Sequence, residues 1–197
     1  MVLVRDGDVV LGDNEDAGTN HPLCGDPSAA TIWVFPPGSD LGGRFGCSWI
    51  GWPYGDRVSG QAGMNGAGLA LGLTAVPPVK MTPHPEHPYS TAVHGGLYYR
   101  VLLNCETVED ALKTCRSYDL EELPYQILVA DRSGDAAVIS PGKDGELHVL
   151  RRPSETPFLV ASTLNAASGQ AIGPRDARRR MRDATRVFMT DLSLIHI

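Results

Sequence analysis

The sequence predicts an α+β domain built as a four-layer αββα sandwich, with helices outside two stacked antiparallel sheets. Three observations predict this class. Short β-branched and aliphatic runs alternate with turn residues early in the chain, as hairpin-connected antiparallel strands require. Two helical patterns follow in tandem, and then come a second block of strands and a further helix. Separate blocks of strands and helices are typical of layered α+β domains.

The first sixteen residues predict a β-hairpin that ends in a polar cluster. Val2–Val4 and Val9–Leu11 are short apolar runs, and Asp6-Gly7 between them suits a tight turn. The second run leads into an acidic and amide-bearing segment that closes at Asp16. Taken alone, this segment is either a solvated acidic turn or the polar end of two buried strands that present a site.

Strand signals continue through the first half of the chain. Thr31–Phe35 predicts a strand halted by prolines, and Phe45–Ile50 predicts another. Leu69, Leu71 and Leu73 alternate with small residues up to Thr74, which predicts a strand with one small-residue face. Such a face lets a neighbouring backbone or a ligand approach closely. The glycines nearby do not complete a dinucleotide-binding fingerprint.

Pro77–Pro88 predicts an extended, proline-rich loop. It contains His84 and His87, whose spacing would suit a metal ion only on a helix. The prolines at 83, 85 and 88 exclude a helix there. We therefore expect no metal ligands, and no motif in the chain indicates a cofactor.

The second half of the chain predicts helices, then strands. Thr91–Asn104 carries apolar residues at helical spacing, and Thr107 with Asp110 forms a capping box that opens a second helix, Val108–Tyr118. The elements expected after these are the strands Tyr125–Ala130, Asp135–Ser140, Leu147–Arg151 and Phe158–Thr163 and the helix Pro174–Met189.

Composition excludes several classes of function. A net charge of −6 leaves no basic excess to neutralise phosphates, so we expect no nucleic-acid partner. No apolar run reaches the length of a membrane-spanning helix. The four cysteines, at positions 24, 47, 105 and 115, show no CxxC pairing. We expect Cys105 and Cys115 to be packed thiols rather than nucleophiles.

We expect one incomplete domain over residues 1–191, truncated at both ends. The last six residues, Leu192–Ile197, resemble a translated sequencing adapter, and the preceding residues stop inside a helical pattern. The chain as given shows no signal peptide. Localisation is left open: cytoplasmic by default, secreted or periplasmic if a leader stood upstream.

An ordered series of segments carries a family resemblance. The segments are VVLGDNED (Val9–Asp16), IWVFPP (Ile32–Pro37), GRFG (Gly43–Gly46), GMNGAGLALGLTAVPP (Gly63–Pro78), CETVEDAL (Cys105–Leu112), QILVADRSGDAAVI (Gln126–Ile139) and FLVASTLN (Phe158–Asn165). Together they resemble the linear-amide C–N hydrolases of the N-terminal-nucleophile (Ntn) superfamily, the group of choloylglycine hydrolase, penicillin V acylase and related acyltransferases. The resemblance implies the αββα fold, autoprocessing, and a small acyl amide as substrate.

The resemblance also implies a mechanism and its residues. An N-terminal cysteine attacks the amide carbonyl while its own α-amine acts as the base. Asp16 matches the carboxylate that orients this cysteine, Thr74 matches an asparagine of the oxyanion site, and Thr163, with Asn165 nearby, matches another. No cysteine begins this chain, so we expect the nucleophile about three residues before Met1 and expect residues 1–191 to be inactive.

Two functions remain open at this point. The first is an amide hydrolase or acyltransferase acting on a small N-acylated compound. The alternative is a catalytically silent relative that binds a small ligand, which the substitutions at Asp13, Thr74 and Thr163 favour. Many bile-salt-type members have arginine at the position of Asp13, so bile salts are a poor expectation. The sequence leaves open whether the protein forms a homo-oligomer.

Overall fold

A computed structural model describes residues 1–13, 30–38, 43–54, 57–90, 96–159, 161, 164–165 and 170–171. In these ranges seven strands form one antiparallel sheet in which each strand pairs with its neighbours in sequence. In order, they are β3 (Thr31–Phe35), β4 (Cys47–Tyr54), β5 (Arg57–Asn65), β6 (Ala70–Lys80), β7 (Glu122–Ala130), β8 (Ala136–Pro141) and β9 (Leu147–Arg151).

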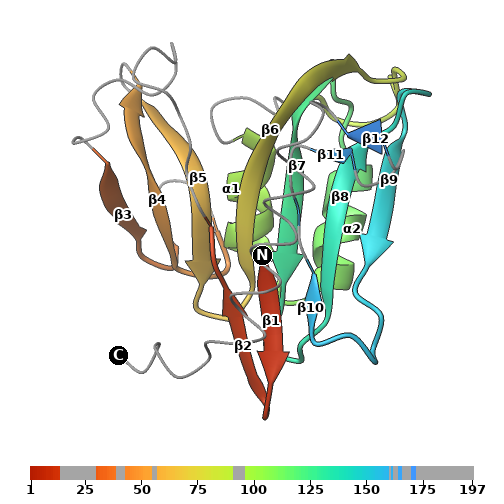
Figure 1. The fold of residues 1–197 in the computed structure, drawn as a ribbon. Helices are drawn as coiled ribbons and strands as arrows, with labels where there is room; N and C mark the ends of the chain where they lie inside the picture. The colour runs from red at the N-terminus through yellow and green to blue at the C-terminus, as the bar shows by residue number, and fades with distance from the viewer. Residues whose placement is uncertain are drawn as a thin grey trace.

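Two helices, α1 (Gly96–Asn104) and α2 (Val108–Arg116), lie together on one face of this sheet (Figure 1). The main core fills the space between them and the sheet. It joins leucines from β6, among them Leu71 and Leu73, to Leu102 and other residues of the helices. The strands bury every second side chain toward the helices, which is the alternation predicted for Leu69–Thr74.

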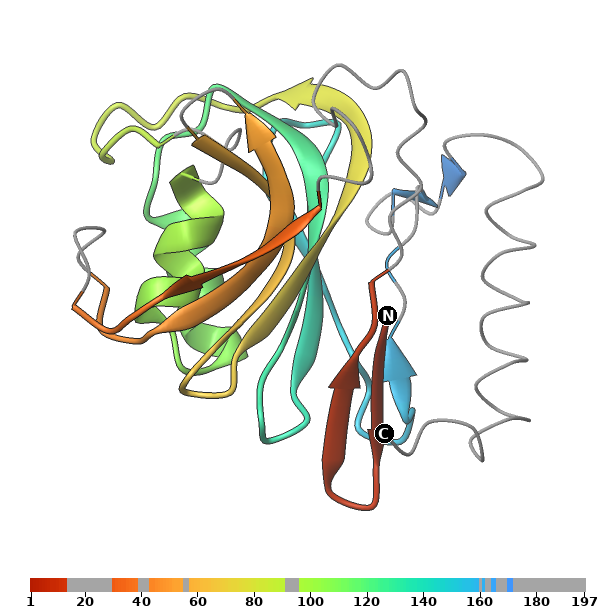
Figure 2. The same ribbon diagram turned by 90° about the vertical axis from the view of Figure 1, so that its left-hand side faces the viewer.

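The opposite face of the sheet carries a second, smaller sheet of three strands. β1 (Val2–Arg5) lies between β2 (Asp8–Leu11) and β10 (Phe158–Leu159) in the order β10-β1-β2. Figure 2 shows this sheet on the side away from the helices. Val2 and Leu159 pack against alanines, Leu128 and Val138 of β7 and β8. Two short strands, β11 (Leu164–Asn165) and β12 (Gln170–Ala171), form a separate pair.

The predicted α+β class is confirmed. The described residues form three layers: helices, large sheet and small sheet. The fourth layer of the predicted sandwich depended on the helix expected at Pro174–Met189, and that segment lies outside the described residues.

Two local predictions are confirmed in detail. Asp6 and Gly7 have positive φ angles of 54° and 89°, as the two central residues of a tight hairpin turn require. Thr107 caps α2 by accepting a hydrogen bond from the backbone N–H of Asp110, whose side chain accepts one from the N–H of Thr107.

The predicted loop at Pro77–Pro88 is wrong in its first part. β6 continues through both prolines to Lys80, and its register against β7 shifts between Ala75 and Val79. The prolines lie in this irregularity, where no backbone N–H is needed for the ladder. β5 had no separate signal in the sequence, because this strand is rich in glycine and polar residues.

A tryptophan and two cysteines are buried in the main core. Trp49 is fully buried in the main core. Cys105 and Cys115 are each 1% exposed, so the prediction of packed thiols is confirmed. Burial raises the pKa of the Cys115 thiol to about 12. In the part of the chain that the structure describes, no helix is long and apolar enough to cross a membrane.

Candidate active site

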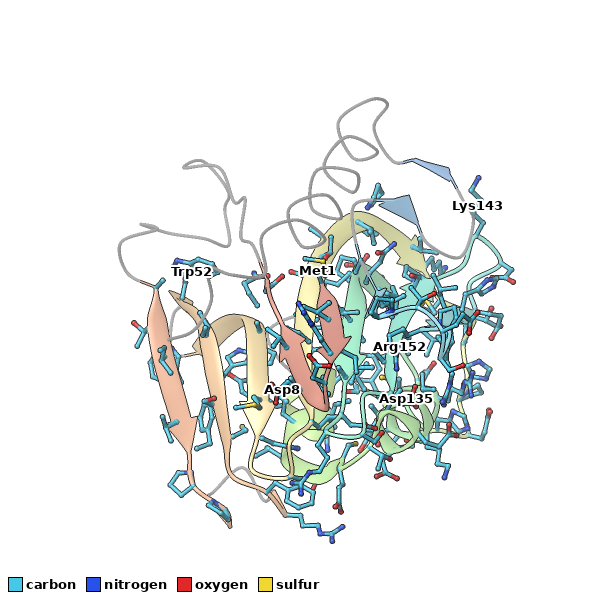
Figure 3. All side chains as sticks on the ribbon, turned by 60° about the horizontal axis from the view of Figure 1, so that its bottom comes forward. Met1, Asp8, Trp52, Asp135, Lys143 and Arg152 are labelled. Carbon is cyan, nitrogen blue, oxygen red and sulfur yellow. The ribbon has the colours of Figure 1, made fainter. Side chains whose placement is uncertain are left out.

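The candidate active site begins at the first residue of the chain, next to β1. The α-amino group of Met1 donates a hydrogen bond of 2.6 Å to the carbonyl of Gly12, and the N–H of Gly12 donates one of 2.8 Å to the carbonyl of Met1. These bonds close the open end of the β1–β2 hairpin. Figure 3 shows Met1 over the central strands of the large sheet.

Gly72 of β6 makes room for a carboxylate at this place. A Cβ built on Gly72 would lie 3.3 Å from Cγ of Asp13 and 3.5 Å from each of its carboxylate oxygens. The small-residue face predicted for this strand is thus the face that Asp13 approaches. A methyl group at position 72 would meet the Asp13 carboxylate in tight contact, and a larger side chain would displace that carboxylate.

The Met1 nitrogen lies in an environment that changes its basicity. Burial lowers the pKa of this α-amine below its ordinary value, and the Asp13 carboxylate opposes that shift. A lowered pKa leaves more of the amine unprotonated near neutral pH.

Thr74 lies on the same face of β6 as Gly72. The two residues are separated by one position, and side chains alternate along a strand. Leu71 and Leu73 point to the helix side, so Gly72 and Thr74 point to the side of the small sheet. Thr74 is half-buried on this face.

Thr74 begins a polar row across the large sheet that the sequence reasoning missed. Gln126 of β7 is the partner of Thr74 in the ladder, and Ser140 of β8 lies on the same face. Gln126 is fully buried and Ser140 is 1% exposed. The signal available in the sequence was one polar residue inside each of the apolar runs YQILVA and AAVIS. Buried polar residues on a strand face that is otherwise apolar indicate a site or a specific contact.

Of the other predicted site residues, the structure describes Asn165 but not Asp16 or Thr163. Asn165 belongs to β11, where its backbone pairs with Gln170. Asp16 and Thr163 lie outside the described residues, as does Cys24. The structure therefore brings together Met1, Asp13, Gly72 and Thr74. Within the described ranges, a group of three side chains able to hold a metal ion occurs at His84, Glu86 and His87, away from this site.

Solved structures with the same fold come from two bacteria. Penicillin V acylase from Agrobacterium tumefaciens is 18% identical with a TM-score of 0.62, and the match covers 100% of this chain and 58% of that one. A single-residue variant of conjugated bile acid hydrolase from Clostridium perfringens is 16% identical with a TM-score of 0.52, covering 63% of this chain and 43% of that chain. A second mutant of the same hydrolase is 12% identical with a TM-score of 0.53, covering 86% and 67%.

These structures are longer than this chain, and the matches span roughly half to two thirds of their lengths. At such identities they show the fold. No curated protein matches the sequence. The family model described as acyl-coenzyme A:6-aminopenicillanic acid acyl-transferase matches residues 48–172, more than half of the chain. The chain therefore belongs to this acyl-transferase family, within the Ntn linear amide hydrolase group that its sequence resembles.

Proposed function

We propose that the protein is an amide hydrolase or acyltransferase that acts on a small N-acylated compound through an N-terminal cysteine located just before Met1. One observation carries the proposal: Asp13, just after β2, lies over Gly72 of β6, on the face that also carries Thr74, and the adjoining Gly12 is hydrogen-bonded to Met1. Family membership supports the same chemistry.

The proposed reaction has two steps. The cysteine thiol gives its proton to the α-amine, and the sulfur attacks the amide carbonyl carbon to form a tetrahedral oxyanion. The C–N bond then breaks, the leaving amine takes the proton, and a thioester remains on the enzyme. In the second step a water (hydrolase) or an acceptor amine (acyltransferase) attacks the thioester and releases the cysteine.

The chain's own residues would support these steps. The α-amine of the upstream cysteine is proposed to act as the base. Burial lowers the pKa of the Met1 α-amine at this end of the hairpin, and we propose that the cysteine's α-amine is desolvated in the same way. Asp16 is proposed to orient the cysteine and amine. Thr74, Thr163 and Asn165 are proposed to surround the oxyanion, where one fixed donor is typically worth about 3–4 kcal/mol.

Asp13 narrows the choice of substrate. Its carboxylate lies over Gly72 on the face proposed for the site. An anionic group placed next to it would be repelled. We therefore propose that neutral or cationic acyl amides are better substrates than bile-salt conjugates.

The test starts from the coding sequence extended upstream through the nearest in-frame cysteine codon. Mass spectrometry of the purified protein is expected to show processing to that cysteine, and a panel of N-acyl amides is expected to show turnover. Replacing the cysteine by alanine should abolish turnover. Residues 1–191 alone should be inactive, and activity of that fragment above background would refute the cysteine mechanism.

A matched pair of variants tests Thr74 in the extended protein. Thr74→Val removes the hydroxyl at nearly constant shape and is expected to lower kcat about a hundredfold, whereas Thr74→Ser keeps the donor and should retain most activity. Equal activity of the two variants would remove Thr74 from the mechanism. Ligand binding with no thioester and no turnover would instead favour the silent relative.

A further inference from the structure

The loop after β6 places two histidines and a glutamate together. Its sequence is Pro83-His-Pro-Glu-His-Pro88. From the sequence alone, we expect that only a helix could bring the two imidazoles to one metal ion. The structure uses a turn instead, because the N–H of His87 donates to the carbonyl of His84 at 2.9 Å. The two rings consequently stack, with centroids 5.4 Å apart and an interplanar angle of 24°.

The distances within this group suit a small divalent ion. Oε1 of Glu86 lies 3.4 Å from Nδ1 of His84 and 3.6 Å from Nε2 of His87. One ligand atom from each of the three residues falls within 4.8 Å of the others. Ligands about 2.1 Å from a tetrahedral zinc ion are separated from one another by roughly 3.4 Å. The carboxylate oxygen thus lies at coordination spacing from both nitrogens.

A second carboxylate lies on the other side of His84. Oε2 of Glu146, from the turn between β8 and β9, is 3.8 Å from Nε2 of His84. Metal-binding histidines commonly direct their second ring nitrogen to a carboxylate, which fixes the tautomer and orients the ring. With Glu146 facing Nε2, the lone pair of Nδ1 is available on the side of Glu86.

The loop is held in place by contacts that do not involve an ion. The N–H of His84 donates to Oδ1 of Asp119 at 2.8 Å, and the N–H of Asp119 donates to the carbonyl of Pro88 at 3.1 Å. At the start of the loop, the N–H of Thr82 donates to the carbonyl of Gly145 at 3.0 Å. Three prolines further restrict the backbone. Ligands ordered in advance bind at a lower entropic cost.

We propose that His84, Glu86 and His87 bind one divalent transition-metal ion of the zinc type, with Glu146 orienting His84. Two imidazoles and one carboxylate form a ligand set that zinc accepts with a position left for water. A cavity of about 200 Å³ adjoins the group, and both histidines and Glu146 line it. It offers room for water ligands. This cavity lies on the helix side of the large sheet, opposite the face of the candidate active site.

The competing explanation is a plain ion-pair cluster. Glu86 would then lie between two imidazoles without any metal, and its pKa is indeed lowered, first by a backbone hydrogen bond and further by both histidines. The two explanations differ in whether Zn²⁺ binds with defined stoichiometry at these residues.

The test uses the chain as it stands, free of any affinity tag, with ZnCl₂ titrated against a chromogenic chelator. One equivalent is expected to bind. His84→Gln and His87→Gln are each expected to weaken binding at least about a hundredfold, and Glu146→Gln about tenfold or more. Unchanged circular dichroism and thermal unfolding of the metal-free variants show that they fold.

His148→Gln is the matched control, because His148 also contacts a carboxylate, that of Asp144 at 3.0 Å, but belongs to no group of three ligand side chains in the described ranges. This variant should bind zinc like the wild type. A Co²⁺ spectrum with the intense visible bands of four-coordinate cobalt would support the site directly. Absence of micromolar Zn²⁺ binding by the wild type, or unweakened binding by the His84 and His87 variants, would overturn the proposal in favour of the ion-pair cluster.

Discussion

Asn65 shows how one buried polar residue can hold two elements together. Its Nδ2 donates to the carbonyls of Leu102 and Cys105, at 2.8 and 2.7 Å, and its Oδ1 accepts from the N–H groups of Ala67 and Leu69. The side chain is 4% exposed. It therefore joins the β5–β6 turn to the end of α1, and its full set of four partners leaves no polar atom of this side chain unsatisfied.

We expect Asn65→Asp to lower the free energy of unfolding by roughly 3 kcal/mol or more. The carboxylate cannot donate to the two carbonyls and would be a buried, repelled charge. Urea unfolding at neutral pH measures the change. Met64→Ala is the control, because Met64 is 55% exposed on the neighbouring position and should change stability little. A loss below about 1 kcal/mol for Asn65→Asp would contradict this account.

In the hairpin of β4 and β5, two glycines of β5 leave room for the Trp49 indole of β4. Trp49 is fully buried against β5, and a Cβ built on Gly60 would lie 1.1 Å from its Nε1. A Cβ on Gly63 would lie 2.4 Å from its Cε3. The indole thus occupies the space that side chains would take at two positions of the next strand. This explains why β5 could not be recognised from an apolar alternation.

Gly60→Ala is expected to destabilise the protein by about 1–3 kcal/mol or more, because the rigid indole must move to admit the methyl group. Gly66→Ala is a matched control in the adjoining turn, where the nearest atom lies 3.7 Å from the place that the methyl carbon would take and φ is not positive. Tryptophan fluorescence during urea unfolding reports both variants. Equal stability of the two variants would show that the indole of Trp49 does not need the space that Gly60 leaves.

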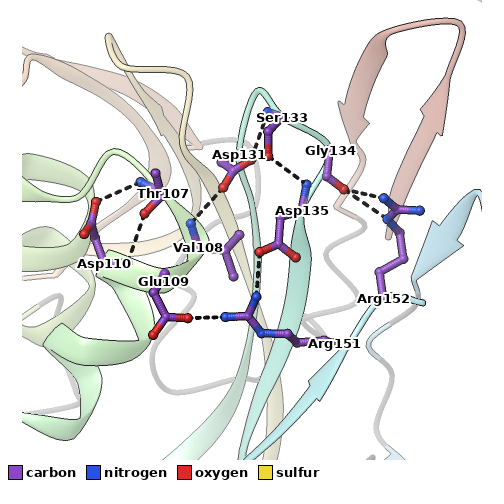
Figure 4. A network of polar contacts seen from close by, with 10 residues as sticks. All are labelled: Thr107, Val108, Glu109, Asp110, Asp131, Ser133, Gly134, Asp135, Arg151 and Arg152. Carbon is purple, nitrogen blue, oxygen red and sulfur yellow. Dashed lines mark hydrogen bonds and ion pairs between the residues drawn. The ribbon is translucent and has the colours of Figure 1, made fainter. Parts of the chain in front are cut away.

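A polar network connects α2, the β7–β8 turn and the segment that leads from β9 to β10 (Figure 4). Asp131 accepts from the N–H of Val108 at 2.9 Å and from Ser133. Arg152 donates to the carbonyls of Gly134 and Thr156, at 2.7 and 2.5 Å. The chain between β9 and β10 is thereby fixed beside β8, at the point where it leads into the small sheet.

We expect Arg152→Met to loosen the small sheet and to cost about 1–3 kcal/mol, since the carbonyls of Gly134, Pro153 and Thr156 lose a charged donor. Hydrogen exchange of the Val4 N–H, which bonds the carbonyl of Pro157, should become faster. Arg151→Met is the control: that neighbouring arginine forms exposed ion pairs with Glu109 and Asp135, worth less than about 1 kcal/mol. Equal exchange in both variants would argue that Arg152 does not anchor the sheet.

At the scale of the whole molecule, the turns and caps that depend on neighbouring residues could be predicted from the amino-acid sequence. The Asp6-Gly7 turn and the Thr107 capping box follow from backbone chemistry within four residues. Ordered motifs along the chain also predicted the family and the α+β class. Thr74 was singled out by the resemblance, although its hydroxyl has no special place in the strand pattern.

Which distant residues meet was settled by the tertiary structure alone. Asp13 lies over Gly72 because the end of β2 approaches β6, and Gln126 and Ser140 extend the polar row because three strands align in one register. Likewise, Glu146 faces His84 because the turn between β8 and β9 lies beside the loop after β6. Such meetings depend on strand order and on packing between sheets, whose energies come from contacts far apart in sequence. No local pattern of residues encodes them.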